Sequence, residues 1–201
     1  MRVIAERAVR GELPIDVRAV ISDRADARGL ETAASMGIPV ASLSPKDFPD
    51  RPSFDSALAR LIDQYQPGLL ILAGFMRILG GAFTSHFNGR TLNIHPSLLP
   101  KYRGLHTHRR ALEAGDAHHG VSVHFVTEEL DGGPVVIQAR VPVLPDDTEA
   151  TLIERVQHQE HSIYPEVVGW FASGRLVCRD GEAWLDGSPL KNPVIREASI
   201  T

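Results

Sequence analysis

The chain has 201 residues, of which 43% are hydrophobic and 23% are charged, values that are ordinary for a globular protein with one substantial core. Its formal net charge is -4, from 21 basic and 25 acidic side chains, which gives no broad electrostatic footprint for a nucleic-acid partner. The single cysteine, Cys178, excludes an intramolecular disulfide, and no apolar run is long enough to span a bilayer. We therefore expect one cytoplasmic domain over residues 1–201, without a membrane or nucleic-acid partner.

The first half of the chain alternates helical and strand-like patterns. Leu69–Ala73 is continuously apolar, as expected of a strand that is covered on both faces. The alternation predicts an α/β fold, Rossmann-like and doubly wound, with a mostly parallel sheet. The expected helices are Met1–Arg10, Ala25–Met36, Ser53–Tyr65 and a short one near Ala82, and the expected strands are Val17–Ile21, Ile38–Leu43, Leu69–Ala73 and Thr91–Ile94.

The last third of the chain predicts an antiparallel C-terminal portion of this sheet. Residues Val121–Val126 alternate between the two faces of a strand. Thr127–Gly133 then forms a loop, and Pro134–Val143 returns as the next strand. A small polar hairpin at about residues 175–190, centred on Leu176–Leu185, closes the domain.

A long helix is expected between these strands and the hairpin. Asp146 followed by Glu149 resembles a capping box, which would open a helix that runs towards Gly174. Pro165 lies inside this segment and should kink or divide the helix.

The densest polar constellation is the run Asn93-Ile94-His95-Pro96, at the end of a predicted strand. Because side chains alternate along a strand, Asn93 and His95 point to the same side. An amide that can stabilise an oxyanion, beside an imidazole that can move protons near neutral pH, suits acyl transfer. The alternative is that both side chains only cap a strand and a turn, and the spacing alone does not choose between the two interpretations.

A second candidate element is the run Glu129-Leu130-Asp131-Gly132-Gly133. The two glycines allow a tight backbone and the close approach of a ligand. A carboxylate near His95 would favour the protonated imidazole and fix its orientation. Without further context, Asp131 would be interpreted as part of an ordinary acidic turn.

Three longer runs supply that context: AGFMRIL over 73–79, NIHPSLLPKYRGLHTH over 93–108 and HGVSVHFVTEELDGGPVV over 119–136. Their residues and their order closely resemble the phosphoribosylglycinamide formyltransferase family, over nearly the whole chain. The resemblance implies the formyltransferase fold and transfer of a formyl group to the amine of 5'-phosphoribosylglycinamide, in purine (IMP) biosynthesis. The donor would be 10-formyltetrahydrofolate, a small-molecule co-substrate rather than a tightly bound cofactor.

The resemblance also implies roles for individual residues. In the catalytic group, Asn93 would stabilise the oxyanion, His95 would be the catalytic histidine, and Asp131 would polarise it through charge and water. Further roles are implied for the folate-binding residues Met76, Arg77, Ile78, Leu79 and Asn93, for Arg51 near the carboxylate-bearing tail of the folate, for the substrate-binding pair Gln157 and Glu160, and for Ser122 and His124 at the flank of the site.

The start of the chain departs from the family pattern. The resemblance implies an opening apolar strand and a Gly-Ser-Asn loop that holds the substrate phosphate at a helix N-terminus. Met1 falls about where that loop would lead into the first helix. We expect either a longer natural chain or a damaged phosphate site, and favour the longer chain because a central strand is costly to lose.

Other functions remain open at this stage. Methionyl-tRNA formyltransferase and formyltetrahydrofolate deformylase would share the folate site, but each carries an extra domain that 201 residues do not accommodate. A folate-binding protein without catalysis is a third possibility. The histidines at 106, 108, 118 and 119 lack a completing ligand pattern, so no metal site is expected. The expected assembly is a monomer or a homodimer.

Overall fold

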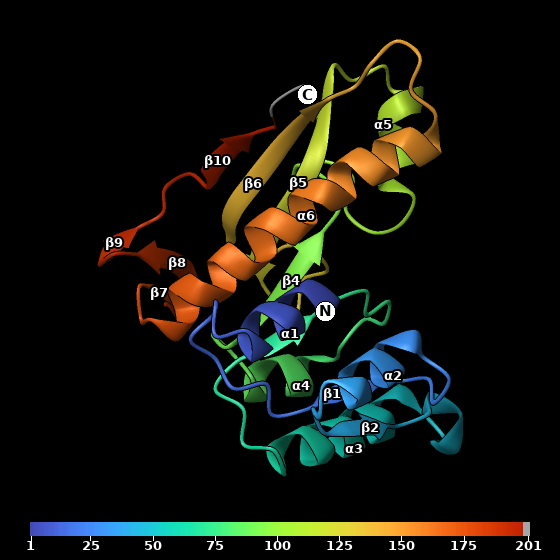
Figure 1. Ribbon diagram of the computed structural model, residues 1–201, viewed down its shortest axis with the longest axis vertical. Coiled ribbons are helices and arrows are strands. Elements are labelled where there is room, and N and C mark those ends of the chain that lie inside the picture. The colour runs from blue at the N-terminus through green and yellow to red at the C-terminus, as the bar shows by residue number, and fades with distance from the viewer. Residues whose placement is uncertain (199–201) are drawn as a thin grey trace.

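The computed structural model describes residues 1–198 (Figure 1). Helices and strands alternate through the first half, and long strands and one long helix dominate the second. The elements in chain order are α1 (Arg2–Val9), β1 (Val20–Ser22), α2 (Arg28–Ser35), β2 (Val40–Ser42), the 3-10 helix η1 (Pro45–Asp47), α3 (Arg51–Asp63), β3 (Leu70–Leu72), α4 (Gly81–His86), β4 (Thr91–His95), α5 (Thr107–Glu113), β5 (His118–Phe125), β6 (Val135–Pro142), α6 (Glu149–Ala172), β7 (Leu176–Arg179), β8 (Glu182–Leu185), β9 (Ser188–Pro189) and β10 (Val194–Glu197).

The main sheet has five strands in the order β10-β6-β5-β4-β3. β3 pairs with β4 in parallel, and β10 pairs with β6 in parallel, whereas β5 is antiparallel to both β4 and β6. β5 is therefore the one strand of this sheet that runs against the others. The predicted α/β class, mostly parallel with an antiparallel C-terminal portion, is confirmed.

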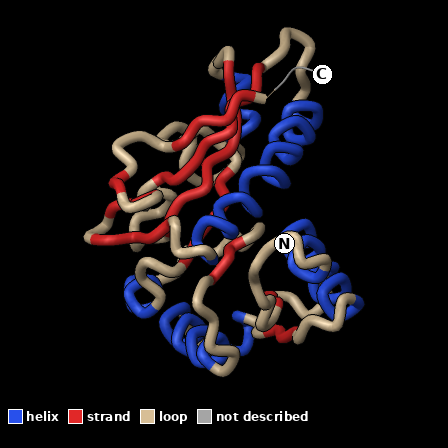
Figure 2. The backbone as a smooth tube through the Cα atoms, turned by 60° about the vertical axis from the view of Figure 1, so that its left-hand side comes forward, coloured by secondary structure: helices blue, strands red, loops and turns tan. Residues whose placement is uncertain are grey.

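Helices cover both faces of the sheet, as a doubly wound fold requires. α6 crosses the face of β5 and β6 (Figures 1 and 2), and together with α1 it forms the larger core. α3 and α4 form a second core. β3 contributes to both, because Leu69 and Ile71 pack against the first core while Leu70 and Leu72 pack against the second.

The pair β1 and β2 forms a separate two-stranded parallel sheet. β3 was expected to be covered on both faces, and side chains of both cores do pack against it, yet each of Leu70, Ile71 and Leu72 is only half-buried. The physical reason is that β3 lies at the edge of the main sheet, where β4 is its one partner in the described part of the chain.

The start of α6 corrects one expectation. The N-cap is Thr148, whose hydroxyl accepts from the Thr151 amide at 3.2 Å, and the Thr151 hydroxyl accepts from the Thr148 amide at 3.0 Å. The predicted capping pair, Asp146 and Glu149, was therefore wrong. The observed pair, Thr148 and Thr151, lies two residues further along the chain. Pro165 does not divide the helix, which continues to Ala172.

The C-terminal hairpin is present as β7 and β8, paired antiparallel, with β9 added as a third strand. The chain then returns to the main sheet as β10, which sequence patterns did not predict.

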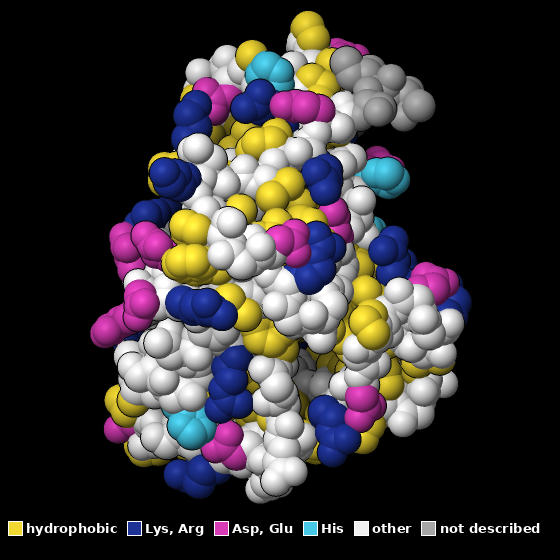
Figure 3. All heavy atoms as spheres, turned by 90° about the vertical axis from the view of Figure 1, so that its left-hand side faces the viewer, with side chains coloured by type: hydrophobic (Ala, Val, Ile, Leu, Met, Phe, Trp, Pro, Cys, Tyr) yellow, Lys and Arg dark blue, Asp and Glu magenta, His cyan; other side chains and the backbone are white. Residues whose placement is uncertain are grey.

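Charged side chains of both signs are interspersed over the face drawn in Figure 3, without a broad area of one sign. In residues 1–198 we find no helix with the length and apolarity needed to cross a membrane.

Candidate active site

The end of β4 brings the two central candidates together with β5. In the register of this antiparallel pair, Asn93 lies opposite His124 and His95 lies opposite Ser122. A β-bulge interrupts the pairing of β5 with β6 between Val123 and His124. Bulges of this kind re-aim a side chain beside a site, so the local backbone of β5 contributes to the position of His124.

The His95 ring is almost fully buried and faces an oxygen atom at each nitrogen. Nε2 lies 2.9 Å from the Tyr102 carbonyl oxygen, and since a carbonyl only accepts, Nε2 carries a proton. Nδ1 lies 3.4 Å from Oδ2 of Asp131, which is beyond a direct hydrogen bond. Asp131 therefore acts on the ring through charge, and Nδ1 is the nitrogen left to exchange a proton with a ligand.

The position of the Asp131 carboxylate is fixed by its own backbone conformation and by a hydrogen bond from a neighbouring loop. Its own φ is 48°, a left-handed conformation, and its Oδ2 accepts a hydrogen bond from the Gly104 amide at 2.9 Å. A side chain at Gly133 would collide with the Phe125 carbonyl oxygen, so the chain can pass here only with glycine. These contacts tie the Asp131 loop to the segment that supplies the Tyr102 carbonyl.

The His124 ring determines how Asn93 presents its amide. Nδ1 of His124 donates to the Phe125 carbonyl oxygen at 2.9 Å, and burial lowers the pKa of the ring, which is therefore neutral with a bare Nε2. Nε2 lies 3.2 Å from Nδ2 of Asn93 and accepts one of its two hydrogens. The second N–H of Asn93 remains available for a ligand oxygen.

Ser122 lies on β5 opposite His95, in the interior of the protein. Its hydroxyl donates to the Ser97 carbonyl oxygen at 2.6 Å and accepts from the Leu99 amide at 3.1 Å. Gln138 donates to the same hydroxyl at 2.9 Å. Ser122 is fully buried, so it holds the segment after His95 in place rather than facing a ligand.

The expected folate residues separate into two groups. Arg51, Met76, Arg77 and Ile78 together line one cavity of about 440 Å³, and Met76 and Ile78 are 78% and 50% exposed. Leu79 instead is buried in the core that α3 and α4 form. Exposed apolar side chains that gather at a cavity are typical of a ligand-binding surface.

Asp55 supports this cavity and was missed in the sequence. It is buried, its Oδ2 accepts from the Gly80 amide at 2.8 Å, and the same atom lies 4.0 Å from Nε of Arg51. The only signal was its spacing four residues after Arg51, which places the two on one helix face. Arg77 is oriented by Asp23, whose Oδ2 lies 2.7 Å from its Nε.

Gln157 and Glu160 lie on α6, one turn apart. Gln157 is exposed and Glu160 is half-buried. Burial raises the pKa of Glu160, against the opposing effect of the Met1 amino group beside it. Within residues 1–198, neither side chain makes a hydrogen bond with Asn93, His95 or Asp131.

Two further histidines pack beside this region. The His108 and His119 rings meet edge to face with centroids 5.0 Å apart, and Nδ1 of His108 and Nε2 of His119 are buried without a partner in the described structure. Burial lowers the pKa of His119 to about 4, and His108 beside it contributes. No cluster of three or more metal-ligating side chains occurs among residues 1–198.

Comparison with known proteins gives a consistent result. The formyl transferase family model matches residues 1–168. The chain is 55% identical to the phosphoribosylglycinamide formyltransferase of Escherichia coli strain K12 over 94% of its length and 90% of the relative. It is 45% identical to the human trifunctional purine biosynthetic protein adenosine-3 over 78% of the chain and 16% of that protein. The structure of the Coxiella burnetii phosphoribosylglycinamide formyltransferase superposes with a TM-score of 0.92 and 52% identity, covering 96% of this chain and 92% of that one.

Proposed function

The chain belongs to the phosphoribosylglycinamide formyltransferase family, and on that premise we propose that it transfers the formyl group of 10-formyltetrahydrofolate to the amine of 5'-phosphoribosylglycinamide. This is a step of purine biosynthesis. The observation that carries the proposal is the convergence of an amide, an imidazole and a carboxylate at the end of β4. His95 lies 3.4 Å from Asp131, and Asn93 lies one strand position away on the same side.

The proposed reaction needs an oxyanion donor and a proton carrier. The amine nitrogen attacks the formyl carbon, a C–N bond forms, and the carbonyl oxygen becomes an oxyanion. The free N–H of Asn93 donates to that oxygen. The bond from the formyl carbon to N10 of the folate then breaks, and one proton passes from the amine to N10. Nδ1 of His95 carries this proton.

Asp131 makes the proton carrier effective. Its carboxylate oxygen lies 3.4 Å from Nδ1 of His95, where its negative charge attracts the positive charge that the ring carries during the transfer. The Tyr102 carbonyl holds the opposite nitrogen, Nε2, so that the ring keeps one orientation during the transfer.

The formyl-folate is proposed to occupy the cavity that Arg51, Met76, Arg77 and Ile78 line. Met76 and Ile78 offer the apolar surface, and Arg51 offers a cation to the carboxylate-bearing tail of the folate. Arg77 contributes through its backbone, because its guanidinium is bound to Asp23. Leu79 supports the cavity from the core. Gln157 and Glu160 are proposed to contact the phosphoribosylglycinamide.

A turnover assay with matched acceptors tests the proposal. Release of tetrahydrofolate should require phosphoribosylglycinamide and yield the formylated product in equal amount. Release of formate at the same rate with water as the only acceptor would show a deformylase instead. Formyl-folate binding without either product would show a binding protein.

A further inference from the structure

Tyr164 of α6 places a buried hydroxyl between the ends of two strands. Its oxygen lies 2.8 Å from the Leu72 carbonyl oxygen on β3 and 3.0 Å from the Leu92 carbonyl oxygen on β4. Carbonyl oxygens only accept, so the single hydroxyl hydrogen is shared between the two. Burial raises the pKa of Tyr164 well above its ordinary range, so the hydroxyl stays protonated and remains a donor.

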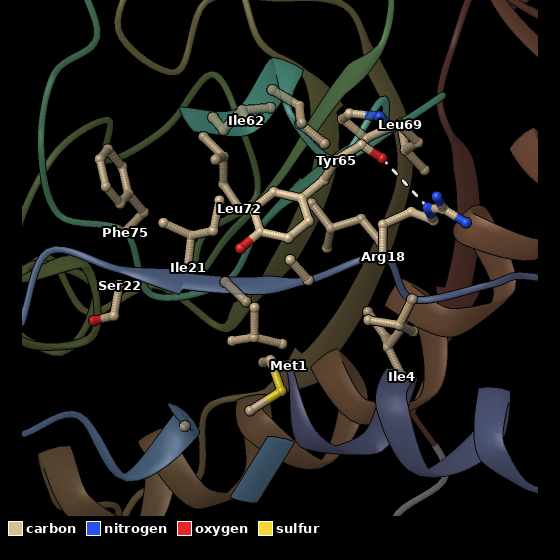
Figure 4. Close-up of a pocket in the computed structure, with 18 of the residues that line it drawn as sticks. Met1, Ile4, Arg18, Ile21, Ser22, Ile62, Tyr65, Leu69, Leu72 and Phe75 are labelled. Atoms are coloured by element: carbon tan, nitrogen blue, oxygen red, sulfur yellow. Dashed lines mark hydrogen bonds between the residues drawn. The ribbon is translucent and has the colours of Figure 1, made fainter. Parts of the chain in front are cut away.

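The two carbonyl groups lead directly into the candidate site. Leu72 is the last residue of β3, and the chain continues past Phe75 (Figure 4) to residues 76–78, which line the proposed folate cavity. Leu92 directly precedes Asn93 on β4. Ligands of α/β proteins bind beyond the carboxyl ends of the strands. The hydroxyl therefore holds the last backbone groups before the folate cavity and before the proposed oxyanion donor.

Tyr164 also lies on the helix that is proposed to bind the acceptor. Gln157, Glu160 and Tyr164 are spaced by three and four residues, so their side chains follow one stripe of α6. In residues 1–198, the contacts of the Tyr164 hydroxyl are the only hydrogen bonds that join α6 to β3 or β4. The rest of this contact is apolar packing, which is non-directional, whereas a hydrogen bond fixes distance and angle.

The oxygen atom of Tyr164 is not needed to fill the core. The neighbouring buried side chains of α6, Ile163, Val167 and Val168, are apolar, and a phenylalanine ring would occupy the same space. Burying a hydroxyl costs free energy that only its hydrogen bonds offset. The hydroxyl is thus best explained by the two carbonyl groups that it holds.

We propose that Tyr164 is a positioning residue for formyl transfer, whose hydroxyl fixes the folate cavity after β3, Asn93 on β4 and the acceptor-binding stripe of α6 relative to one another. The inference rests on the proposed function. The hydroxyl acts through the backbone rather than on the reacting atoms. It keeps the two bound substrates in the alignment in which the amine reaches the formyl carbon.

Tyr164→Phe removes the oxygen atom and leaves the ring. We expect kcat at saturating concentrations of both substrates to fall about tenfold, since a misplacement of ~1 Å costs on the order of 10²-fold and the loss of one hydrogen bond moves the strand ends by less. The KM for each substrate should change by less than about twofold, because each binding surface stays intact on its own element. Steady-state kinetics with both substrates varied measures this split between kcat and KM.

Ile163→Val is the matched control at the preceding residue of α6. Ile163 is 1% exposed in the same core, so this variant loses buried packing without removing a hydrogen bond to either strand. It should lower the urea midpoint, as Tyr164→Phe does, but leave kcat unchanged. An equal loss of kcat in both variants would make Tyr164 an ordinary core residue and overturn the proposal. So would a Tyr164→Phe variant that keeps the wild-type kcat.

A spectroscopic measurement tests the geometry without turnover. Ala73 and Asn93 supply the N–H groups of the two peptide units whose oxygens bind the hydroxyl. In nitrogen–proton correlation NMR spectra, Tyr164→Phe should move both amide signals, whereas Ile163→Val should leave them in place. Unmoved signals in Tyr164→Phe would overturn the proposal. A wild-type chain without turnover would refute the proposed function itself, whereas an active wild type that Tyr164→Phe matches in kcat refutes the role of Tyr164 alone.

Discussion

At the scale of single residues, the proposed chemistry depends most on the His95 ring, anchored at Nε2 and open at Nδ1. We expect His95→Ala to lower kcat by roughly 10²–10⁴-fold, the span of general acid-base catalysis, because the variant has no imidazole at that position to move the proton. The affinity for formyl-folate should barely change. Steady-state kinetics and equilibrium folate binding are the measurements, with His118→Ala as the control, since His118 is exposed at the far end of β5. Near-normal turnover would falsify the assignment.

The carboxylate of Asp131 is expected to act through its charge. Asp131→Asn keeps an oxygen that can accept from the Gly104 amide but removes the negative charge beside His95. The rate should fall, because the ring loses the negative charge that stabilises it while it carries the proton. Glu129→Gln is the control in the same loop, since Glu129 pairs with Arg103. A rate that does not change would make Asp131 a turn residue.

Residue-type patterns could identify only part of this site. Asn93 and His95 are noticeable because their side-chain types suit the proposed chemistry, whereas Asp131 was singled out only through the resemblance of the longer runs. Tyr102 and Gly104 contribute a carbonyl oxygen and an amide, and every residue type has both, so no sequence signal marks them. The N-cap of α6 is a second example of this limit: the sequence pattern indicated Asp146, whereas the structure has Thr148 as the N-cap.

At the scale of elements, the loop into α6 depends on a largely buried ion pair. Asp147 accepts from Nη1 and Nη2 of Arg155 at 2.6 and 2.8 Å and from the Leu144 amide at 2.7 Å. Asp147→Ala should lower the free energy of unfolding by about 3 kcal/mol, the low end for breaking a buried pair, because Arg155 retains some exposure. Urea denaturation measures the loss. Asp146→Ala, which alters an exposed neighbour, should change stability by less than about 0.5 kcal/mol, and equal losses in both variants would refute the role of the pair.

Element types were predictable where the apolar pattern was long and regular. The helix over Ser53–Tyr65 and the alternating strand over Val121–Val126 correspond to α3 and β5. α5 and β10 were missed, because a seven-residue helix and a four-residue edge strand carry too few periods to recognise. The pairing of β10 with β6 is also non-local, and no local pattern encodes it.

At the scale of the whole molecule, the buried histidines link stability to pH. His119 is 1% exposed, and its pKa of about 4 in the folded chain lies below the ordinary value of 6.5 because burial disfavours the charged ring. Tyr102 and His108 pack against the ring, and Asp116 and His95 act on it through charge. Between pH 6.5 and about 4 the unfolded chain binds the proton and the folded chain does not. Stability is therefore full above pH 6.5 and is lost as the pH falls towards 4.

Removing the ring at position 119 should flatten this dependence. We expect wild-type protein to lose roughly 2–3 kcal/mol of unfolding free energy through His119 between pH 7 and pH 4, at about 1.36 kcal/mol per pKa unit. His119→Asn has no titrating ring but retains an N–H that can donate to the Pro96 carbonyl, so its stability should fall less steeply over the same range. Burial also lowers the pKa of His108 and His124, so some slope persists in the variant. Urea denaturation at several pH values measures both slopes, with His118→Asn as the exposed control. If His119→Asn and wild type lose stability in parallel from pH 7 to pH 4, His119 does not carry the dependence.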